Sequence, residues 1–233
     1  MKQGKPLLAI AGILLFLSVP FSVAREISLS YDPNGNLLRD EQNLYSYNSL
    51  NQLENVRENA EGQRILEAYV YDDSGKRIKK VSFRADGTNE TTYYANENFI
   101  RVVNSSGTFD TAFYFHNSQR IARKDPDGKM FFYHPDHLGS TDLVTDEDGK
   151  QVEKTSYMPF GEVLSGGESR FGFTGKEKDK DTGLMYYGAR YYDPSFKRFT
   201  QPDSVIADVY NPQNLNRYSY VMNNPRVYTD PSG

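Results

Sequence analysis

The sequence predicts an all-β protein made of stacked β-hairpins. Three observations support this prediction: one four-residue turn pattern recurs along the chain, aromatic residues are abundant, and few stretches show the apolar spacing of a helix. The 18 tyrosines and 14 phenylalanines among 233 residues favour strands, because large rings pack well on a pleated surface.

The recurrent turn has the pattern Asp-x-x-Gly. Aspartate at the first position accepts hydrogen bonds from backbone amides ahead of it, and glycine at the fourth position tolerates a positive φ. A type I turn followed by such a glycine closes a hairpin with a twist that suits its two strands. The pattern occurs, with a leading tyrosine in the first two cases, at residues 32–35, 72–75, 125–128 and 146–149.

Strand-forming runs lie beside these turns, at residues 67–71, 91–94, 111–115 and 129–133. A single hairpin buries too little apolar surface to be stable, whereas hairpins stacked side by side bury a continuous face. We therefore expect an open, curved sheet with exposed edges, which invite pairing with another chain or with a second copy.

The N-terminus has the features of a secretory signal peptide. Lys2 and Lys5 precede an uncharged apolar run over residues 7–19, and small residues lead up to a cleavage position after Ala24. The run is shorter than the roughly 20 apolar residues that span a bilayer, although an uncleaved anchor stays an alternative. We predict that residues 1–24 direct export to the periplasm, the cell surface or the medium, with no membrane span after cleavage.

Charge and cysteine content exclude several functions. Removing residues 1–24 takes away two lysines and no acid, which leaves 25 basic and 31 acidic residues. This acidic balance, without a basic block, argues against a nucleic-acid partner. The absence of cysteine excludes thiol catalysis and thiolate metal sites. Residues 176–181 alternate in charge sign and are interpreted as a solvated loop.

No metal or cofactor is predicted. His134 and His137 have the spacing H-x-x-H, but His116 is the one further histidine, so a zinc site lacks partners. We expect a structural turn with His137 stacked in an aromatic layer. The acidic turn at residues 125–128 lacks the ligand spacing of a calcium loop. Arg190 is expected to stack on a ring or to pair with an aspartate, most simply as a cross-strand salt bridge.

The second half of the sequence carries a long series of distinctive motifs. They are YHPDHLGST (133–141), YMPFGE (157–162), FTGKE (173–177), TGLMYYGARYYDP (182–194), RFTQPD (198–203), NRYSY (216–220), NNP (223–225) and the final DPSG (230–233). This series resembles the RHS repeat-associated core domain, and the earlier turns resemble the YD repeats of the same family.

The resemblance implies both a fold and a division of the chain. Members wind YD-repeat hairpins into a hollow spiral shell, and the core domain closes one end and curls inward. We accordingly expect degenerate YD-repeat hairpins over residues 25–133 and an RHS core domain over residues 134–233. In polymorphic toxins of this family, a variable effector follows the core and is held inside the shell.

The resemblance also implies a candidate chemistry. In toxin-complex relatives, the core is similar to an aspartyl autoprotease that cuts just beyond a DP-x-G motif. The positions that match here are Asp203 and Asp230, two carboxylates that would share one proton and activate water. The alternative is that both aspartates cap turns beside the prolines that accompany them. The residue that follows the motif in relatives, commonly leucine, has no counterpart after Gly233.

Three functions follow, in order of preference. The first is an exported shell and core fragment of a polymorphic-toxin system for interbacterial competition, structural rather than enzymatic and without its own effector. Its partners would be other RHS-shell or toxin chains, or copies of itself. The second is an aspartyl self-cleaving core. The third is a cell-surface module that binds glycans or peptides on a tyrosine-rich concave face.

Overall fold

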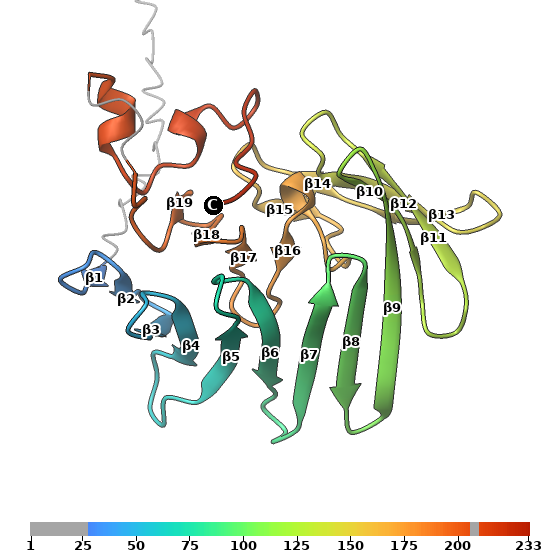
Figure 1. Ribbon diagram of the computed structural model, residues 1–233, viewed down its shortest axis with the longest axis horizontal. Helices are drawn as coiled ribbons and strands as arrows, with labels where there is room; N and C mark the ends of the chain where they lie inside the picture. The colour runs from blue at the N-terminus through green and yellow to red at the C-terminus, as the bar shows by residue number, and fades with distance from the viewer. Residues whose placement is uncertain (1–27, 206–209) are drawn as a thin grey trace, which may run out of the picture.

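The computed structural model describes residues 28–205 and 210–233, so the expected signal peptide lies outside the described residues. The chain forms one antiparallel sheet of 13 strands in sequence order, followed by a two-stranded and a four-stranded sheet. The large sheet curves around the two small ones and stays open at both ends (Figure 1). This confirms the all-β prediction and the open, curved sheet.

Each strand of the large sheet pairs with the next one in the sequence. The strands are β1 (Ser30–Tyr31), β2 (Leu37–Arg39), β3 (Asn43–Tyr47), β4 (Leu53–Glu58), β5 (Ile65–Tyr71), β6 (Arg77–Phe83), β7 (Asn89–Asn96), β8 (Phe99–Asn104), β9 (Gly107–His116), β10 (Gln119–Lys124), β11 (Met130–Pro135), β12 (Thr141–Thr145) and β13 (Gln151–Lys154). The four expected strand runs lie in β5, β7, β9 and β11.

The remaining residues form what we term the inner segment, the described part of residues 156–233. Its elements are β14 (Ser156–Tyr157), β15 (Val163–Ser165), β16 (Glu177–Lys178), β17 (Met185–Tyr186), β18 (Tyr191–Asp193), β19 (Arg198–Phe199) and three short 3-10 helices, η1 (Phe173–Gly175), η2 (Pro212–Leu215) and η3 (Val221–Asn223). None of the helices in residues 28–205 and 210–233 is long and apolar enough to cross a membrane.

The hairpin turns form as the Asp-x-x-Gly pattern predicts. In the turn after β5, the Asp72 carboxylate accepts hydrogen bonds from the amides of Ser74 (3.0 Å) and Lys76 (2.9 Å). Gly75 closes the turn with a φ of +84°, a conformation that side chains with a Cβ rarely adopt. The same bonding recurs at Asp136, whose turn belongs to the DHLGS motif. That motif is therefore one more hairpin turn of the repeat.

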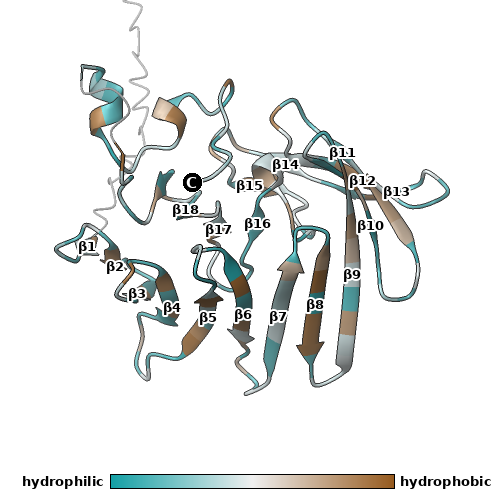
Figure 2. Ribbon diagram, in the orientation of Figure 1, coloured by the Kyte–Doolittle hydropathy of each residue, from teal (hydrophilic) through white to brown (hydrophobic). Residues whose placement is uncertain are grey.

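Apolar packing joins the inner segment to the sheet. Leu184 and Tyr191 of the inner segment pack into a cluster with Tyr45, Leu53 and Val56 of the early strands. A second cluster lies within the inner segment around buried aromatic rings: Phe173, Tyr187, Tyr192, Phe199 and Tyr220. Apolar and polar bands alternate along strands such as β9 (Figure 2), which fits a sheet with one face covered and one exposed.

Candidate functional site

The final DPSG motif forms a turn that is docked onto the inner segment. Asp230 Oδ1 accepts hydrogen bonds from the amides of Ser232 (3.1 Å) and Gly233 (2.8 Å). The Ala189 amide donates to the Ser232 carbonyl at 2.8 Å. A Cβ on Gly188 would lie 2.8 Å from that carbonyl oxygen, so this close approach requires glycine. Asp230 therefore does cap a turn, and the turn is anchored.

Arg190 brings the two predicted carboxylates together. Its Nη2 lies 3.0 Å from Asp203 Oδ2 and 3.6 Å from Asp230 Oδ2. Its guanidinium stacks on the Phe199 ring, 3.8 Å from the centroid, and Nη1 donates to the Arg217 carbonyl at 3.1 Å. The expected aspartate partner and ring contact of Arg190 are both present. The pairs join loops rather than facing strands, because Arg190 precedes β18 and both aspartates follow β19.

This arginine–aspartate site (Arg190, Asp203 and Asp230) is open to solvent on one side. The Arg190 side chain is 8% exposed, whereas Asp203 is 41% and Asp230 is 20% exposed. All three line a cavity of about 350 Å³. Burial lowers the pKa of Arg190, and the charges of Asp203 and Asp230 oppose that shift. The Arg190 guanidinium links the two carboxylates in this arrangement.

The histidines lie apart from this site. His134 Nε2 is 3.0 Å from Thr145 Oγ1 on the neighbouring strand, and His137 Nε2 is 3.1 Å from the Arg226 carbonyl oxygen. His137 is exposed in its turn instead of stacked in an aromatic layer, so that expectation is wrong. Within the described ranges, no group of three or more acidic or histidine side chains is arranged to hold a metal ion.

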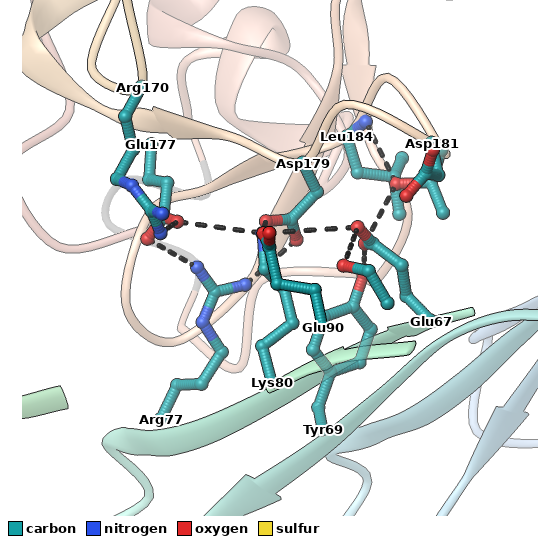
Figure 3. Close-up of polar contacts among 12 residues, drawn as sticks. Glu67, Tyr69, Arg77, Lys80, Glu90, Arg170, Glu177, Asp179, Asp181 and Leu184 are labelled. Atoms are coloured by element: carbon teal, nitrogen blue, oxygen red, sulfur yellow. Dashed lines mark hydrogen bonds and ion pairs between the residues drawn. The ribbon is translucent and has the colours of Figure 1, made fainter. Parts of the chain in front are cut away.

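A second charged site lies deeper, where β6 faces β16 (Figure 3). Six ionisable side chains form this buried charge cluster: Glu67, Arg77, Lys80, Arg170, Glu177 and Asp179. Arg77 contacts Glu177 at 2.7 Å and Asp179 at 2.8 Å, and Lys80 contacts Asp179 at 2.6 Å. The Arg77, Glu177 and Asp179 side chains are at most 4% exposed. Three cations and three acids thus meet between the sheet and the inner segment, and all but Arg170, which is 29% exposed, are buried.

The cluster shifts the pKa values of its acidic members in opposite directions. Burial by itself would raise the pKa of Glu177, but Arg77, Lys80 and Arg170 hold that pKa well below its usual range. Glu67 has weaker support, because its ion pair with Lys80 is 3.9 Å long. Burial and the nearby Asp179 raise the pKa of Glu67 to about 8.

The buried charge cluster corrects the interpretation of residues 176–181 as a solvated loop. Glu177 and Asp179 are buried, and Asp181 pairs with Arg84 at 2.8 Å. The alternation of charge along residues 176–181 could have indicated that one side of the run is buried against cations. On an extended chain, side chains alternate between faces, so every second residue of this run presents an acid to the same side. That acidic side faces the basic residues of β6 and the residue that follows it.

Comparison with known proteins identifies the family of this chain. The sequence profile of the family described as Teneurin YD-shell matches residues 22–226. The chain belongs to the teneurin YD-shell family. This confirms the resemblance to RHS and YD-repeat proteins.

Relatives come from bacteria and animals. The chain is 28% identical over 214 residues to the tRNA nuclease WapA of Bacillus subtilis (strain 168), which covers 88% of this chain and 9% of that protein. It is 28% identical over 211 residues to Teneurin-1 of Gallus gallus, covering 86% of this chain and 8% of the relative. Toxin subunit YenC1 of Yersinia entomophaga is 26% identical over 192 residues, covering 72% and 19%.

A solved structure shares the fold. The crystal structure of TcdB2-TccC3 superposes with a TM-score of 0.75 at 22% sequence identity, covering 87% of this chain and 11% of that chain. The present chain therefore spans about a tenth of the length of the first of these relatives and of this structure.

Proposed function

We propose that this chain is a structural segment of a YD-shell in a toxin system, with the 13-stranded sheet as the wall and the inner segment as its lining. The observation that supports it is the buried charge cluster. Arg77 and Lys80 project from the wall and meet Glu177 and Asp179 of the lining (Figure 3), so buried ion pairs join the two layers.

The toxin context is supported by the relatives. WapA is named a tRNA nuclease and YenC1 a toxin subunit, and each is much longer than the match. The described residues form wall and lining, so we propose an enclosing role for them and assign no effector activity to these residues. We further propose export, on the strength of the signal-peptide features of residues 1–24, and a role in competition between bacteria.

The sheet edges supply the proposed means of assembly. β1 pairs with β2 alone and β13 pairs with β12 alone among the described strands. The edge strand β13 exposes Val152, which is 51% accessible. Unpaired backbone groups along such an edge are a template for a further strand. In the absence of another shell chain, copies of this chain would pair with one another through these edges.

Sedimentation velocity of residues 25–233 over a range of concentrations tests the assembly. We expect reversible self-association that Val152→Lys abolishes, because a lysine on an edge strand opposes pairing. Val70→Lys is the matched control: Val70 is 47% exposed but lies on the central strand β5. A monomer at every concentration, or equal loss in both variants, would contradict the proposal.

A second function, self-cleavage, is favoured by one specific observation. Asp203 and Asp230 are 27 positions apart in the sequence and still meet at Arg190, beside a cavity and next to the anchored DPSG turn. A carboxylate that touches both solvent and a turn is placed to activate water against a nearby peptide bond. The site would act on a chain continued beyond Gly233.

The test of self-cleavage extends the chain with leucine and a tagged reporter after Gly233 and measures intact mass. Splitting next to the junction in the unaltered chain, with Asp203→Asn and Asp230→Asn both staying whole, supports a catalytic pair. If all three proteins are folded and whole, the two aspartates are turn caps and the catalytic proposal is withdrawn.

A further inference from the structure

Arg120 is a half-buried cation without a direct ion pair. It lies on β10, and three phenylalanine rings surround its guanidinium: Phe171 at 3.3 Å, Phe115 at 5.1 Å and Phe113 at 5.3 Å from Cζ to the ring centroid. One Nη donates to the Gly175 carbonyl at 3.2 Å, and Nε is buried without a hydrogen-bond partner.

Three other arginines in or against the inner segment form direct ion pairs. Arg77, Arg170 and Arg190 each contact at least one carboxylate at 3.0 Å or less. No carboxylate in the described part of the chain forms an ion pair with Arg120. A largely buried cation without a direct ion pair is costly, and burial lowers the pKa of Arg120 to about 10, although the charges of Tyr133, Glu177 and Glu97 oppose that shift. Arg120 therefore has unused capacity for an anion.

A cavity provides the room for that anion. Arg120 lines a space of about 610 Å³ between the β9–β10 hairpin, the DHLGS turn and the inner segment. Lys176 and His137 also line it, as do the acids Glu97 and Asp230. Arg120 and Lys176 balance Glu97 and Asp230 in formal charge, so a ligand with one negative charge disturbs the balance less than a doubly charged phosphate. The volume is in the range of about 300–1,000 Å³ that ligand sites usually have, and it exceeds the size of one carboxylate group.

We propose that this cavity binds a glutamate- or aspartate-bearing polypeptide segment, whose carboxylate pairs with Arg120 while its neighbouring residues fill the remaining space. Guanidinium and carboxylate match in planar geometry, which makes the pair specific as well as strong. The cavity adjoins the arginine–aspartate site, because Asp230 lines both cavities, but Arg120 lines the one and Arg190 the other. Binding at Arg120 requires neither self-association nor self-cleavage.

Peptide titration of the full chain tests the proposal. The probes are a blocked pentapeptide, Gly-Ser-Glu-Ser-Gly, its glutamine counterpart, free glutamate and inorganic phosphate. We expect the glutamate peptide to bind at least ten times more tightly than the other three probes. Arg120→Gln should weaken its binding at least tenfold. Arg123→Gln, on the same strand but already paired with Asp125 at 2.9 Å, should leave the affinity within twofold.

A measurement on the unaltered chain covers the case in which Arg120→Gln fails to fold. The Nε–H resonance of Arg120 should shift on addition of the glutamate peptide and stay in place with the glutamine peptide. Equal binding of both peptides, or no binding at millimolar concentration, would overturn the site. Equal binding of free glutamate would overturn the polypeptide as ligand and reassign the cavity to small carboxylates. Preference for phosphate would overturn the carboxylate chemistry.

Discussion

The buried charge cluster and the arginine–aspartate site use the same groups in opposite surroundings. In each, one arginine contacts two carboxylates and lies near aromatic rings. Asp179 is fully buried, whereas Asp203 is 41% exposed beside a cavity. The two sites contain the same residue types, so the solvent exposure of their carboxylates is what distinguishes a structural ion pair from a candidate reactive site. Water reaches the Asp203 carboxylate, whereas Asp179 and Arg77 at the centre of the cluster are buried.

The largest effect is expected from breaking the buried charge cluster. Asp179→Asn removes one of the two carboxylates that Arg77 and Lys80 share and leaves Glu177 as the other, in a buried place, which should lower the free energy of unfolding by about 3–5 kcal/mol. Urea denaturation measures this. Asp181→Asn, which breaks a partly exposed pair with Arg84, should cost less than about 1 kcal/mol. Equal costs would remove the distinction between sealed and open pairs.

The pH dependence of stability should separate two glutamates of the cluster. Folded Glu67, with its pKa raised to about 8, keeps a proton that the unfolded chain loses near pH 4–5, so its contribution is lost as the pH rises towards 8. Glu177, whose pKa is lowered, contributes stability above about pH 4 that is lost on acidification.

Glu67→Gln removes the first of these effects and leaves the second. The free energy of unfolding, measured at pH 5, 6, 7 and 8, should change less with pH in the variant than in the unaltered chain. From pH 5 to pH 8 the variant should become more stable relative to the unaltered chain by more than about 1.4 kcal/mol, the equivalent of one pKa unit. Parallel profiles for the two proteins would show that Glu67 does not change its proton occupancy on folding.

The smallest effect is expected at the arginine–aspartate site. Asp203→Asn changes an exposed carboxylate whose charge is screened by solvent, so the free energy of unfolding should fall by less than about 1 kcal/mol. The same urea titration checks it, with Asp179→Asn alongside. A loss at Asp203 that matches the loss at Asp179 would mean that the site serves mainly to hold the fold.

The repeat was predictable from sequence because its determinants are local. Asp72 and Gly75 lie within one turn, and their backbone bonds need no distant partner. The buried charge cluster was not predictable in the same way, because Arg77 and Asp179 are 102 positions apart and meet only after the sheet has curved. The alternating charges of residues 176–181 show that one side of this run is acidic, but they do not show which surface covers it.

The candidate site was predicted in a different manner. Asp203 and Asp230 were matched through the motifs of a family, and no spacing in this sequence places them together. The prediction that His137 stacks in an aromatic layer was wrong, because its turn lies at the surface, where its partner is the Arg226 carbonyl. Glycan or peptide binding on the concave face stays a prediction.

Cysteine cross-linking between copies tests the proposed shell segment most directly, because the chain has no cysteine of its own. Val152→Cys and Ser30→Cys place a thiol on the edge strands β13 and β1, and Val70→Cys places one on the central strand β5. Under mild oxidation, we predict that the edge variants form disulfide-linked species at least ten times faster than Val70→Cys. Equal rates in folded protein would contradict assembly through the edges of the sheet.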